Sequence, residues 1–448
     1  MATKSLQDGI DEAKSPIALL WHPQPPTPWR PPVVPLEFVG WQAEQTASFE
    51  TASLANLSHH MLDLFIEGPG ATQLLSDYTA NDYTKFDVGQ AKQIVPVTES
   101  GNLVLDGILL RNAENRYTFT GQPPAGEWLQ FQAQAGNYDV ELRVDPSSDH
   151  RGGADPVLFR YQIQGPNALA IVERAFGGPL PETKFFHSAD VSLAGRSFRA
   201  LRHGMNGQPG YEFVGEWADS EVVYEALLKA GEDLGLVQVG ALAYGNNAVE
   251  SGWVPSPIPS IYTDPTLEAY RRWLPLQSWE GKWPLFGTYF SPNIEDYYVS
   301  PYELGYGRSI AFNHDFLGRD ALERASRDGV PRTKVTLELD ADDVRSVFGD
   351  EDRYLMDTGW YRIEVDGQLV GVGLQGVNIA RLNRVLWLSL IAKEHAEPGT
   401  RVELVHGHHP GPGADPDADH GFVRLGATVQ AAPYNAYART GYRDRTTA

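Results

Sequence analysis

Residues 241–256 read ALAYGNNAVESGWVPS, and this stretch is not typical of a surface helix. It begins like a helix, yet Glu250 is soon followed by Trp253 and by three nearby prolines. Proline lacks a backbone N–H and clashes with the preceding helical turn, so something other than helix continuation holds the chain here. Tyr244 and Glu250 lie six residues apart, a spacing at which two polar groups can serve one pocket.

The composition is that of an ordinary folded protein. The chain has 448 residues, of which 42% are hydrophobic and 21% are charged. This length predicts two or three domains, because a single hydrophobic core stops growing well below it. The chain can therefore bury a large core.

Charge and cysteine content exclude several classes of function. A formal net charge of -22 argues against broad binding to nucleic acid or to anionic membranes, so an anionic ligand would need a local basic pocket. With no cysteine, the chain cannot carry disulfides, thiolate zinc sites, cysteine-bound iron–sulfur clusters or a cysteine nucleophile. The N-terminal stretch MATKSLQDGIDEAKSPIALLW has no long apolar run, and we expect a cytoplasmic protein.

The order of patterns along the chain predicts three parts. Residues 1–37 contain HPQPPTPW and read as a proline-rich arm that docks on the protein. Residues 38–330 alternate strand and helix patterns in two related α+β halves, with strands such as MLDLFIEG and LVLDGILLRN. Residues 331–448 are rich in strands such as KVTLELD and predict a small β-barrel or sandwich.

Two motifs have structural explanations that compete with functional ones. Gly371, Gly373 and Gly376 spell the dinucleotide pattern G-x-G-x-x-G, but an apolar strand rather than a long helix follows, which favours a β-turn or bulge. The stretch HGHHPGPGADPDADHG contains four histidines, but its glycines and prolines favour a loop between strands. We expect no metal site.

Four polar residues stand in apolar surroundings. His59 and His60 mark the entry to a predicted strand, where adjacent side chains face opposite sides, so one of them is expected to face inward. Asp106 interrupts the apolar strand LVLDGILL, and Glu250 interrupts NNAVESGW. A buried carboxylate needs a donor, and either a salt bridge inside the fold or a ligand site satisfies that need.

Several segments together resemble the aminomethyltransferase family, which includes the T protein of the glycine cleavage system. The stretch HGMNGQPGYEF resembles the family pattern G-Y-T-G-E-x-G-[FY]-E, and YQIQGP resembles L-x-L-Q-G-P. AYGNNAVESG resembles A-R-D-x-L-R-x-E-A-G, and FLGRDALE resembles F-[IL]-G-R-x-A-L. The order and spacing of these segments hold from about Ala55 to Glu323.

Within this family the chain is most similar to the tetrahydrofolate-dependent aryl O-demethylases, which act on vanillate, syringate or 3-O-methylgallate. The additional similarity lies in ESGWVPSPIPSIYT, KFFHSADVSLAG and NIEDYYVSPYELGYG. The resemblance implies a three-domain α+β fold with a central folate pocket and a C-terminal β-barrel. It also implies transfer of a methyl group from an aryl methyl ether to tetrahydrofolate.

The resemblance further implies roles for ten residues. The expected catalytic residues are Tyr244, His60 and Asp106. The residues expected around the folate are Glu250, Gln164, Tyr211 and Trp253. The residues expected around the aromatic substrate are Gln122, Arg30 and His59.

Two positions depart from the family patterns. Tyr244 and Gly245 stand where the glycine cleavage enzymes carry Arg-Asp, which argues against lipoyl-protein chemistry. Gln122 stands where the aryl demethylases are expected to carry an arginine for the substrate carboxylate. Arg30 is the alternative cation for a benzoate.

The chemistry of these residues fits methyl transfer. A carboxylate such as Glu250 can accept paired hydrogen bonds from the 2-amino and N3–H groups of a pterin. A tyrosine, with an unperturbed pKa of about 10, is suited to protonate or hydrogen-bond a leaving aryloxide. We therefore expect Tyr244 to act as acid or anion stabiliser, His60 to position the ring hydroxyl and Asp106 to act near the folate amine.

Two alternative functions have the same fold, and one of them remains open at this point. One is a folate-dependent demethylase or aminomethyltransferase of the same family that acts on dimethylsulfoniopropionate or an N-methyl substrate. The aromatic stretches WEGKWPLFGTYF and IEDYYVSPYELGY favour a flat ring as substrate, although aromatic residues also build cores. The other alternative, a folate-binding accessory protein with a K-G-C-Y-x-G-Q-E motif, is excluded by the absence of cysteine. We expect a small methoxyarene as partner and no need for nucleic acid, membrane or a second protein.

Overall fold

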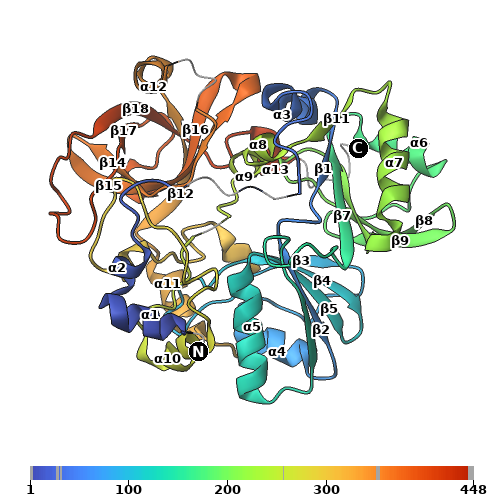
Figure 1. Ribbon diagram of the computed structural model, residues 1–448, viewed down its shortest axis with the longest axis horizontal. Coiled ribbons are helices and arrows are strands. Elements are labelled where there is room, and N and C mark those ends of the chain that lie inside the picture. The colour runs from blue at the N-terminus through green and yellow to red at the C-terminus, as the bar shows by residue number, and fades with distance from the viewer. Residues whose placement is uncertain (1–3, 27–29, 31–32, 256, 350–353, 442–448) are drawn as a thin grey trace.

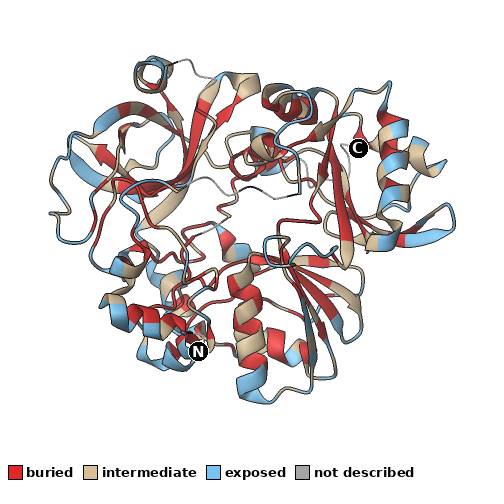
Figure 2. Cartoon of the chain, in the orientation of Figure 1, coloured by how far each residue is buried: buried red, intermediate tan, exposed pale blue. Residues whose placement is uncertain are grey.

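The structure is a computed structural model that describes residues 4–26, 30, 33–255, 257–349 and 354–441. Three β-sheets form three lobes, and Figure 1 shows the lobes around a common centre, with α8 and α9 on its inner side. Figure 1 shows α6 and α7 on the outer side of the first sheet, and Figure 2 shows that the buried residues concentrate on the strands and on the inward helix faces. The predicted α+β fold class is confirmed.

The first sheet has six strands in the order β11-β1-β7-β10-β9-β8. The bounds of its strands are β1 Ala52–Asn56, β7 Leu158–Gln164, β8 Ser188–Leu193, β9 Arg196–Arg202, β10 Gly210–Glu216 and β11 Leu236–Val239. Helices α6 (Ala168–Phe176) and α7 (Ser220–Gly231) share an apolar core with one face of this sheet. Helix α3 (Trp41–Glu50) packs against β1 and β11.

The second sheet has five strands in the order β3-β4-β5-β2-β6. Their bounds are β2 Leu62–Glu67, β3 Ala91–Ile94, β4 Gly107–Ala113, β5 Arg116–Gly121 and β6 Glu141–Asp145. Helices α4 (Ala71–Tyr78) and α5 (Pro123–Gly136) supply the apolar residues that cover it. Asp106 was expected inside a strand, but β4 begins one residue later, so the carboxylate sits at the strand entry.

The third sheet is the C-terminal barrel. Its strands are β12 Arg332–Leu339, β13 Met356–Asp357, β14 Tyr361–Val365, β15 Gln368–Ile379, β16 Arg384–Ala392, β17 Arg401–His406 and β18 Val423–Gln430. They follow the order β13-β15-β14-β17-β18-β12-β16, and β15 pairs back onto β16, which closes six strands into a ring. Helix α12 (Ala341–Phe348) packs against β18 and β16. The barrel that the strand-rich C-terminal pattern predicted is therefore confirmed.

The glycines of the G-x-G-x-x-G pattern lie on β15. A Cβ atom at Gly371 would meet the backbone of the paired strand, and one at Gly376 would meet the indole of Trp387. The register between β15 and β16 shifts between Gly373 and Gln375, which marks a β-bulge. Close packing and a bulge explain these glycines, as the sequence analysis favoured.

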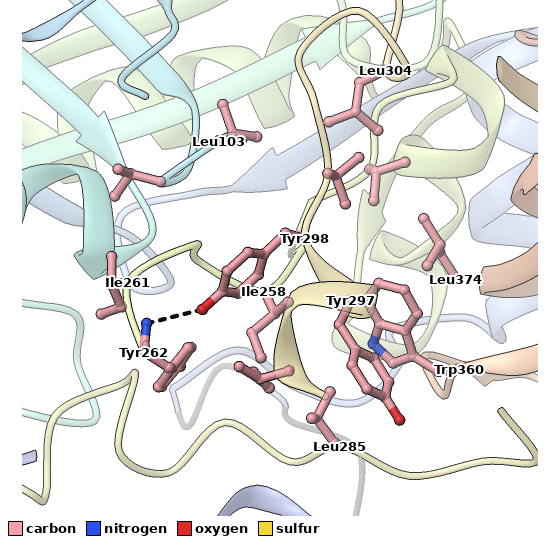
Figure 3. Close-up of a cluster of buried hydrophobic side chains, with 14 of the residues drawn as sticks. Leu103, Ile258, Ile261, Tyr262, Leu285, Tyr297, Tyr298, Leu304, Trp360 and Leu374 are labelled. Atoms are coloured by element: carbon pink, nitrogen blue, oxygen red, sulfur yellow. Dashed lines mark hydrogen bonds between the residues drawn. The ribbon is translucent and has the colours of Figure 1, made fainter. Parts of the chain in front are cut away.

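A long segment with few regular elements joins the lobes. After α9 it contains only short helices, namely η2 Pro265–Leu267, α10 Glu268–Trp273, η3 Ile294–Tyr297 and η4 Tyr306–Ser309, before α11 (Arg319–Asp328). Its apolar side chains share one core with residues of the barrel and of the second lobe, as Figure 3 shows for Tyr297 beside Trp360. The aromatic residues that favoured a flat substrate are thus largely core residues, which corrects that interpretation.

The N-terminal region has two short helices before the proline-rich stretch. They are α1 (Leu6–Ala13), which has a capping box at Ser5, and α2 (Pro16–Leu20). Between His22 and Gly40, the residues that the structure describes form no helix or strand. In the described part of the chain, no helix is long and apolar enough to cross a membrane.

Candidate active site

The stretch quoted first forms two consecutive helices. Helix α8 spans Ala241–Tyr244 and α9 spans Asn246–Ser251, and Gly252 ends α9 in the left-handed conformation at φ 70°. The carbonyls of Pro35 and Leu36 accept hydrogen bonds from the first N–H groups of α8, so the N-terminal region docks on this helix. These short helices place polar side chains, Tyr244 on α8 and Asn247 and Glu250 on α9, against different lobes.

Tyr244 and His60 form a hydrogen-bonded pair. The distance between Tyr244 Oη and His60 Nε2 is 2.7 Å, and the two rings meet edge to face. His60 comes from the turn that precedes β2, and a small pocket beside the pair is lined by Val34, Asn56 and Val239 among others. The structure thus brings together two of the three residues predicted to be catalytic.

Burial keeps both members of this pair uncharged. It lowers the pKa of His60 to about 3, and the nearby Arg160 guanidinium acts in the same direction. Burial raises the pKa of Tyr244 well above its ordinary value, and the charge of Glu212 adds to this effect. The His60 ring also hydrogen-bonds the Leu57 carbonyl, which leaves Nε2 to accept the Tyr244 hydroxyl proton.

Charged residues lie beside this pair on the inner face of the first sheet. Arg160 donates to Asp63 and to Glu212, each at 2.9 Å, and all three side chains are buried. Along β7, Arg160, Gln162 and Gln164 alternate with apolar residues that face α6 and α7. Sequence analysis missed Arg160 and Glu212, although the alternation in FRYQIQ marks a polar strand face.

Gln164 links this sheet face to α9. Its Nε2 donates to Asn247 Oδ1 at 3.1 Å, and its Oε1 accepts from the backbone N–H of Met205 at 2.8 Å. Tyr211 does not belong to this cluster, because it stacks on Phe213 on the opposite, helix-covered face of the sheet. Adjacent strand residues face opposite sides, so Glu212 occupies the inner face in its place.

Glu250 forms a buried ion pair with the barrel. Both of its carboxylate oxygens accept from Nη2 of Arg381 at 2.8 Å, and the glutamate side chain is 0% exposed. Arg381 belongs to η6 (Ala380–Leu382) between β15 and β16, and its guanidinium lies 3.9 Å from the ring centre of Phe49. Burial raises the pKa of Glu250 to about 7, against the lowering effect of the Arg381 charge.

Trp253 and Asp106 meet on the other side of α9. The indole Nε1 of Trp253 donates to Asp106 Oδ2 at 2.7 Å, and Gln93 Nε2 donates to the same oxygen at 2.6 Å. Asp106 is buried, and its Oδ1 has no hydrogen-bond partner among the described residues. Burial raises the pKa of this carboxyl, while the two donors lower it.

The residues expected to bind the aromatic substrate are more dispersed. Gln122 is the N-cap residue of α5, directly after β5. His59 contacts Ser148 Oγ through Nδ1 at 2.9 Å and packs against Trp217, and both histidines are buried because they lie in a turn rather than in a strand. Arg30 is half-buried, and its neighbours at 29, 31 and 32 lie outside the described residues.

The arrangement fits a flat ligand that carries N–H donors. Besides Asp106 Oδ1, the buried amide oxygens Gln162 Oε1 and Gln375 Oε1 accept no hydrogen bond from the described residues. Gln375 lies on β15, and its Nε2 reaches the Gly245 carbonyl at 3.5 Å, next to Tyr244. Buried acceptors without partners are costly, and a ligand that carries N–H groups would satisfy them.

Fold and site together define a three-lobed α+β protein with a buried polar site where the lobes meet. The GCVT N-terminal domain family matches residues 26–255. The chain is similar to syringate O-demethylase of Sphingobium sp. (strain NBRC 103272 / SYK-6), with 39% identity over 459 residues that cover 98% of each protein. It is 30% identical to sesamin methylene transferase of Sinomonas sp. (strain No.22), with coverage of 84% of this chain and 86% of that protein.

A solved structure supports the same assignment of the fold. The glycine cleavage system aminomethyltransferase T from Bartonella henselae aligns with a TM-score of 0.62 at 18% sequence identity, covering 90% of this chain and 91% of that one. The chain belongs to the aminomethyltransferase family, as the sequence motifs indicated. It is an enzyme of this family.

The buried ion pair between Glu250 and Arg381 leads to a prediction about stability. Arg381→Met keeps much of the packing on Phe49 but leaves the Glu250 carboxylate without a cation. We expect the free energy of unfolding at neutral pH to fall by about 3–5 kcal/mol. The measurement is urea unfolding followed by circular dichroism.

The pH dependence and a matched variant test the cause of that loss. The folded-state pKa of Glu250 is raised, and removal of Arg381 raises it further, so the loss should be larger at pH 8 than at pH 5. Arg384→Met is the control, because Arg384 lies three residues away and pairs with Glu338 at a partly exposed site. Its effect should stay below about 1 kcal/mol. Equal losses for the two variants would contradict the assignment.

Proposed function

We propose that this chain is a tetrahydrofolate-dependent O-demethylase. It transfers the methyl group of a methoxylated aromatic compound, of the vanillate or syringate type, to tetrahydrofolate and releases a phenol or catechol together with 5-methyltetrahydrofolate. The observation that carries the proposal is the buried Tyr244–His60 hydrogen bond, in a chain that is 39% identical to a syringate O-demethylase over nearly its whole length. Bound tetrahydrofolate supplies N5 as the methyl acceptor.

Tyr244 is the proposed proton donor. When the methyl–oxygen bond breaks, its electron pair stays on the aryl oxygen, and this oxyanion needs a hydrogen-bond donor or a proton. The raised pKa of Tyr244 means that its hydroxyl is protonated throughout the neutral range. His60 is neutral and accepts from that hydroxyl before the reaction, so its proposed role is to hold the Tyr244 oxygen in place. The single hydroxyl proton then turns from His60 Nε2 to the aryl oxygen, and the proton that N5 loses on methylation restores the balance of the reaction.

Glu250 and Asp106 are the proposed carboxylates of the folate site. Glu250 has two oxygens held by a single Arg381 nitrogen, so lone pairs remain for paired pterin N–H groups. Asp106 offers Oδ1, which is buried without a partner. Gln164 and Trp253 support this site by holding Asn247 and Asp106 in place.

Gln122, Arg30 and His59 are proposed to border the aromatic substrate. Gln122 carries no charge. Among the described residues, neither Arg30 nor His59 has a carboxylate partner in a salt bridge. Arg30 is the proposed cation for a benzoate carboxylate. An uncharged methoxyarene such as guaiacol is the alternative substrate if Arg30 does not reach the pocket.

A direct assay tests the proposal. Purified protein is incubated with and without tetrahydrofolate and with a panel containing vanillate, syringate, guaiacol and dimethylsulfoniopropionate, and both the demethylated product and 5-methyltetrahydrofolate are quantified. We expect product from at least one methoxyarene, only when tetrahydrofolate is present and without added oxygen or NADH. Demethylated product formed without folate, or turnover confined to dimethylsulfoniopropionate, would refute the proposed reaction.

Tyr244→Phe tests the role of the phenol. The variant keeps the ring and its packing on His60 and removes only the hydroxyl. We expect kcat to fall by about 10²–10⁴-fold, because a general acid is lost, with folate affinity nearly unchanged. Steady-state kinetics separate the possibilities, since a change confined to KM would make Tyr244 a substrate-binding residue instead.

Glu250→Gln tests the folate anchor. The amide offers one acceptor where the carboxylate offers two, so we expect the binding free energy of tetrahydrofolate to weaken by about 1.5–3 kcal/mol. Calorimetric titration measures this quantity, and the unfolding midpoint is recorded in parallel because the Arg381 pair is also lost. A lower midpoint with unchanged folate affinity would show that Glu250 is a structural residue only.

A further inference from the structure

Lys334 reaches from the barrel to the turn that ends α9. It lies on β12, and its Nζ donates to the carbonyl oxygen of Gly252. The same ammonium lies 5.6 Å from the ring centre of Tyr306. Gly252 holds the left-handed conformation here, so its carbonyl direction is set by the turn and not by a continuing helix.

The residue after Gly252 continues this connection into the second lobe. Trp253 donates its indole N–H to Asp106 Oδ2, and Gln93 on β3 donates to the same oxygen. Lys334, the Gly252–Trp253 turn and Asp106 therefore form one line of contacts from the barrel to the entry of β4. Lys334 stands at its barrel end.

The charges along this line are complementary. Asp106 is buried, and Lys334 is the cation whose charge acts on its carboxyl. Burial lowers the pKa of Lys334 to about 8, and the Asp106 charge opposes that shift. Tyr306, the other titratable group at this position, is neutral because burial and then Asp106 raise its pKa well above the ordinary value.

The neighbouring charges on β12 are already neutralised. Arg332, two residues before Lys334, pairs with Glu303 at 2.6 Å. The backbone N–H of Lys334 donates to the backbone carbonyl of Glu303, so Glu303 lies beside Lys334, but its carboxylate is the partner of Arg332. Asp106 is the carboxylate on which the Lys334 charge acts.

We propose that Lys334 is a positioning residue of the active site, which holds the Gly252–Trp253 turn against Asp106 and supplies a positive charge beside this contact without touching the substrate itself. The inference rests on the proposed function for the place of Asp106 in the site. In this proposal a charge from the barrel contributes to the electrostatics around Asp106, at the entry to β4 of the second sheet. A lysine in this role, unlike an arginine, loses its charge within the accessible pH range.

Fluorine NMR tests the coupling without any need for activity. The full-length protein is labelled with 5-fluorotryptophan, and the Trp253 resonance is identified by its loss in Trp253→Phe. Its chemical shift is followed against pH in the unmodified protein, in Lys334→Met and in Lys334→Arg. Lys393→Met serves as the matched control, since Lys393 is exposed elsewhere on the barrel.

The expected shifts follow from the sign of the Lys334 charge. Loss of a nearby cation raises a carboxyl pKa, so the acidic midpoint should move up by about one unit or more in Lys334→Met. It should stay in place in Lys334→Arg and in the control. A second transition near pH 8, from Lys334 itself, should vanish in both Lys334 variants. If Lys334→Met does not fold, loss of this second transition in Lys334→Arg decides the question.

The pH profile of demethylation completes the test. The acid limb of kcat should move up in Lys334→Met by the same amount as the Trp253 midpoint. If the acidic midpoint of the Trp253 resonance is unchanged in Lys334→Met, the inference is wrong. If that midpoint moves but the acid limb of the kcat–pH profile does not, Lys334 has no positioning role in the reaction. If the unmodified protein demethylates no methoxyarene, the proposed function is wrong. The Trp253 resonance still reports on Lys334 and Asp106 then, because the NMR measurement does not depend on activity.

Discussion

The ion pair between Glu250 and Arg381 is the interaction on which the site depends. A carboxylate that is 0% exposed needs a partner inside the protein, because desolvation of an unpaired charge costs several kcal/mol. That partner comes from the barrel, more than a hundred residues further along the chain. Helix α9 can therefore hold an ionised Glu250 only when the barrel is docked, which couples the assembly of the three lobes to the chemistry of the site.

The same dependence recurs on the other side of α9. Asp106 faces Lys334, which also belongs to the barrel, and the Lys334 ammonium holds the carbonyl of Gly252. In a chain with a net charge of -22, two half-buried cations of the barrel, Arg381 and Lys334, act on the two buried carboxylates of the proposed folate site. Fixed charges of this kind need no reorganisation when a ligand binds.

Burial also determines what the proposed catalytic pair, Tyr244 and His60, can do. In water a histidine with an ordinary pKa of about 6.5 exchanges protons readily near neutrality. At the Tyr244–His60 contact, burial keeps the imidazole neutral and the phenol protonated. In the structure this proton is donated to His60, so in the proposed mechanism the Tyr244 hydroxyl turns from His60 to the developing oxyanion while the imidazole stays beside it.

Much of this protein could be predicted from its sequence. The strand and helix periodicities predicted the α+β lobes, and the strand-rich C-terminal third predicted a barrel, since each pattern reflects local geometry and burial. The motifs from Ala55 to Glu323 identified the family. Tyr244 stood out because it departs from the family pattern, and Glu250 and Asp106 stood out because each is a polar residue that interrupts an apolar segment. Such violations are visible in a sequence because they conflict with the local pattern.

Only the tertiary structure decided which groups meet. Arg381 and Lys334 lie in ordinary barrel strands or their connections, where basic residues are common, so nothing local distinguishes them. Tyr211 was expected at the site, but Glu212 is the residue of β10 on the inner face. The aromatic stretches after α9 are core residues because the lobes close over them. Sequence determines local periodicity and the presence of costly polar groups, but the partners that satisfy those groups lie far along the chain and are selected by packing.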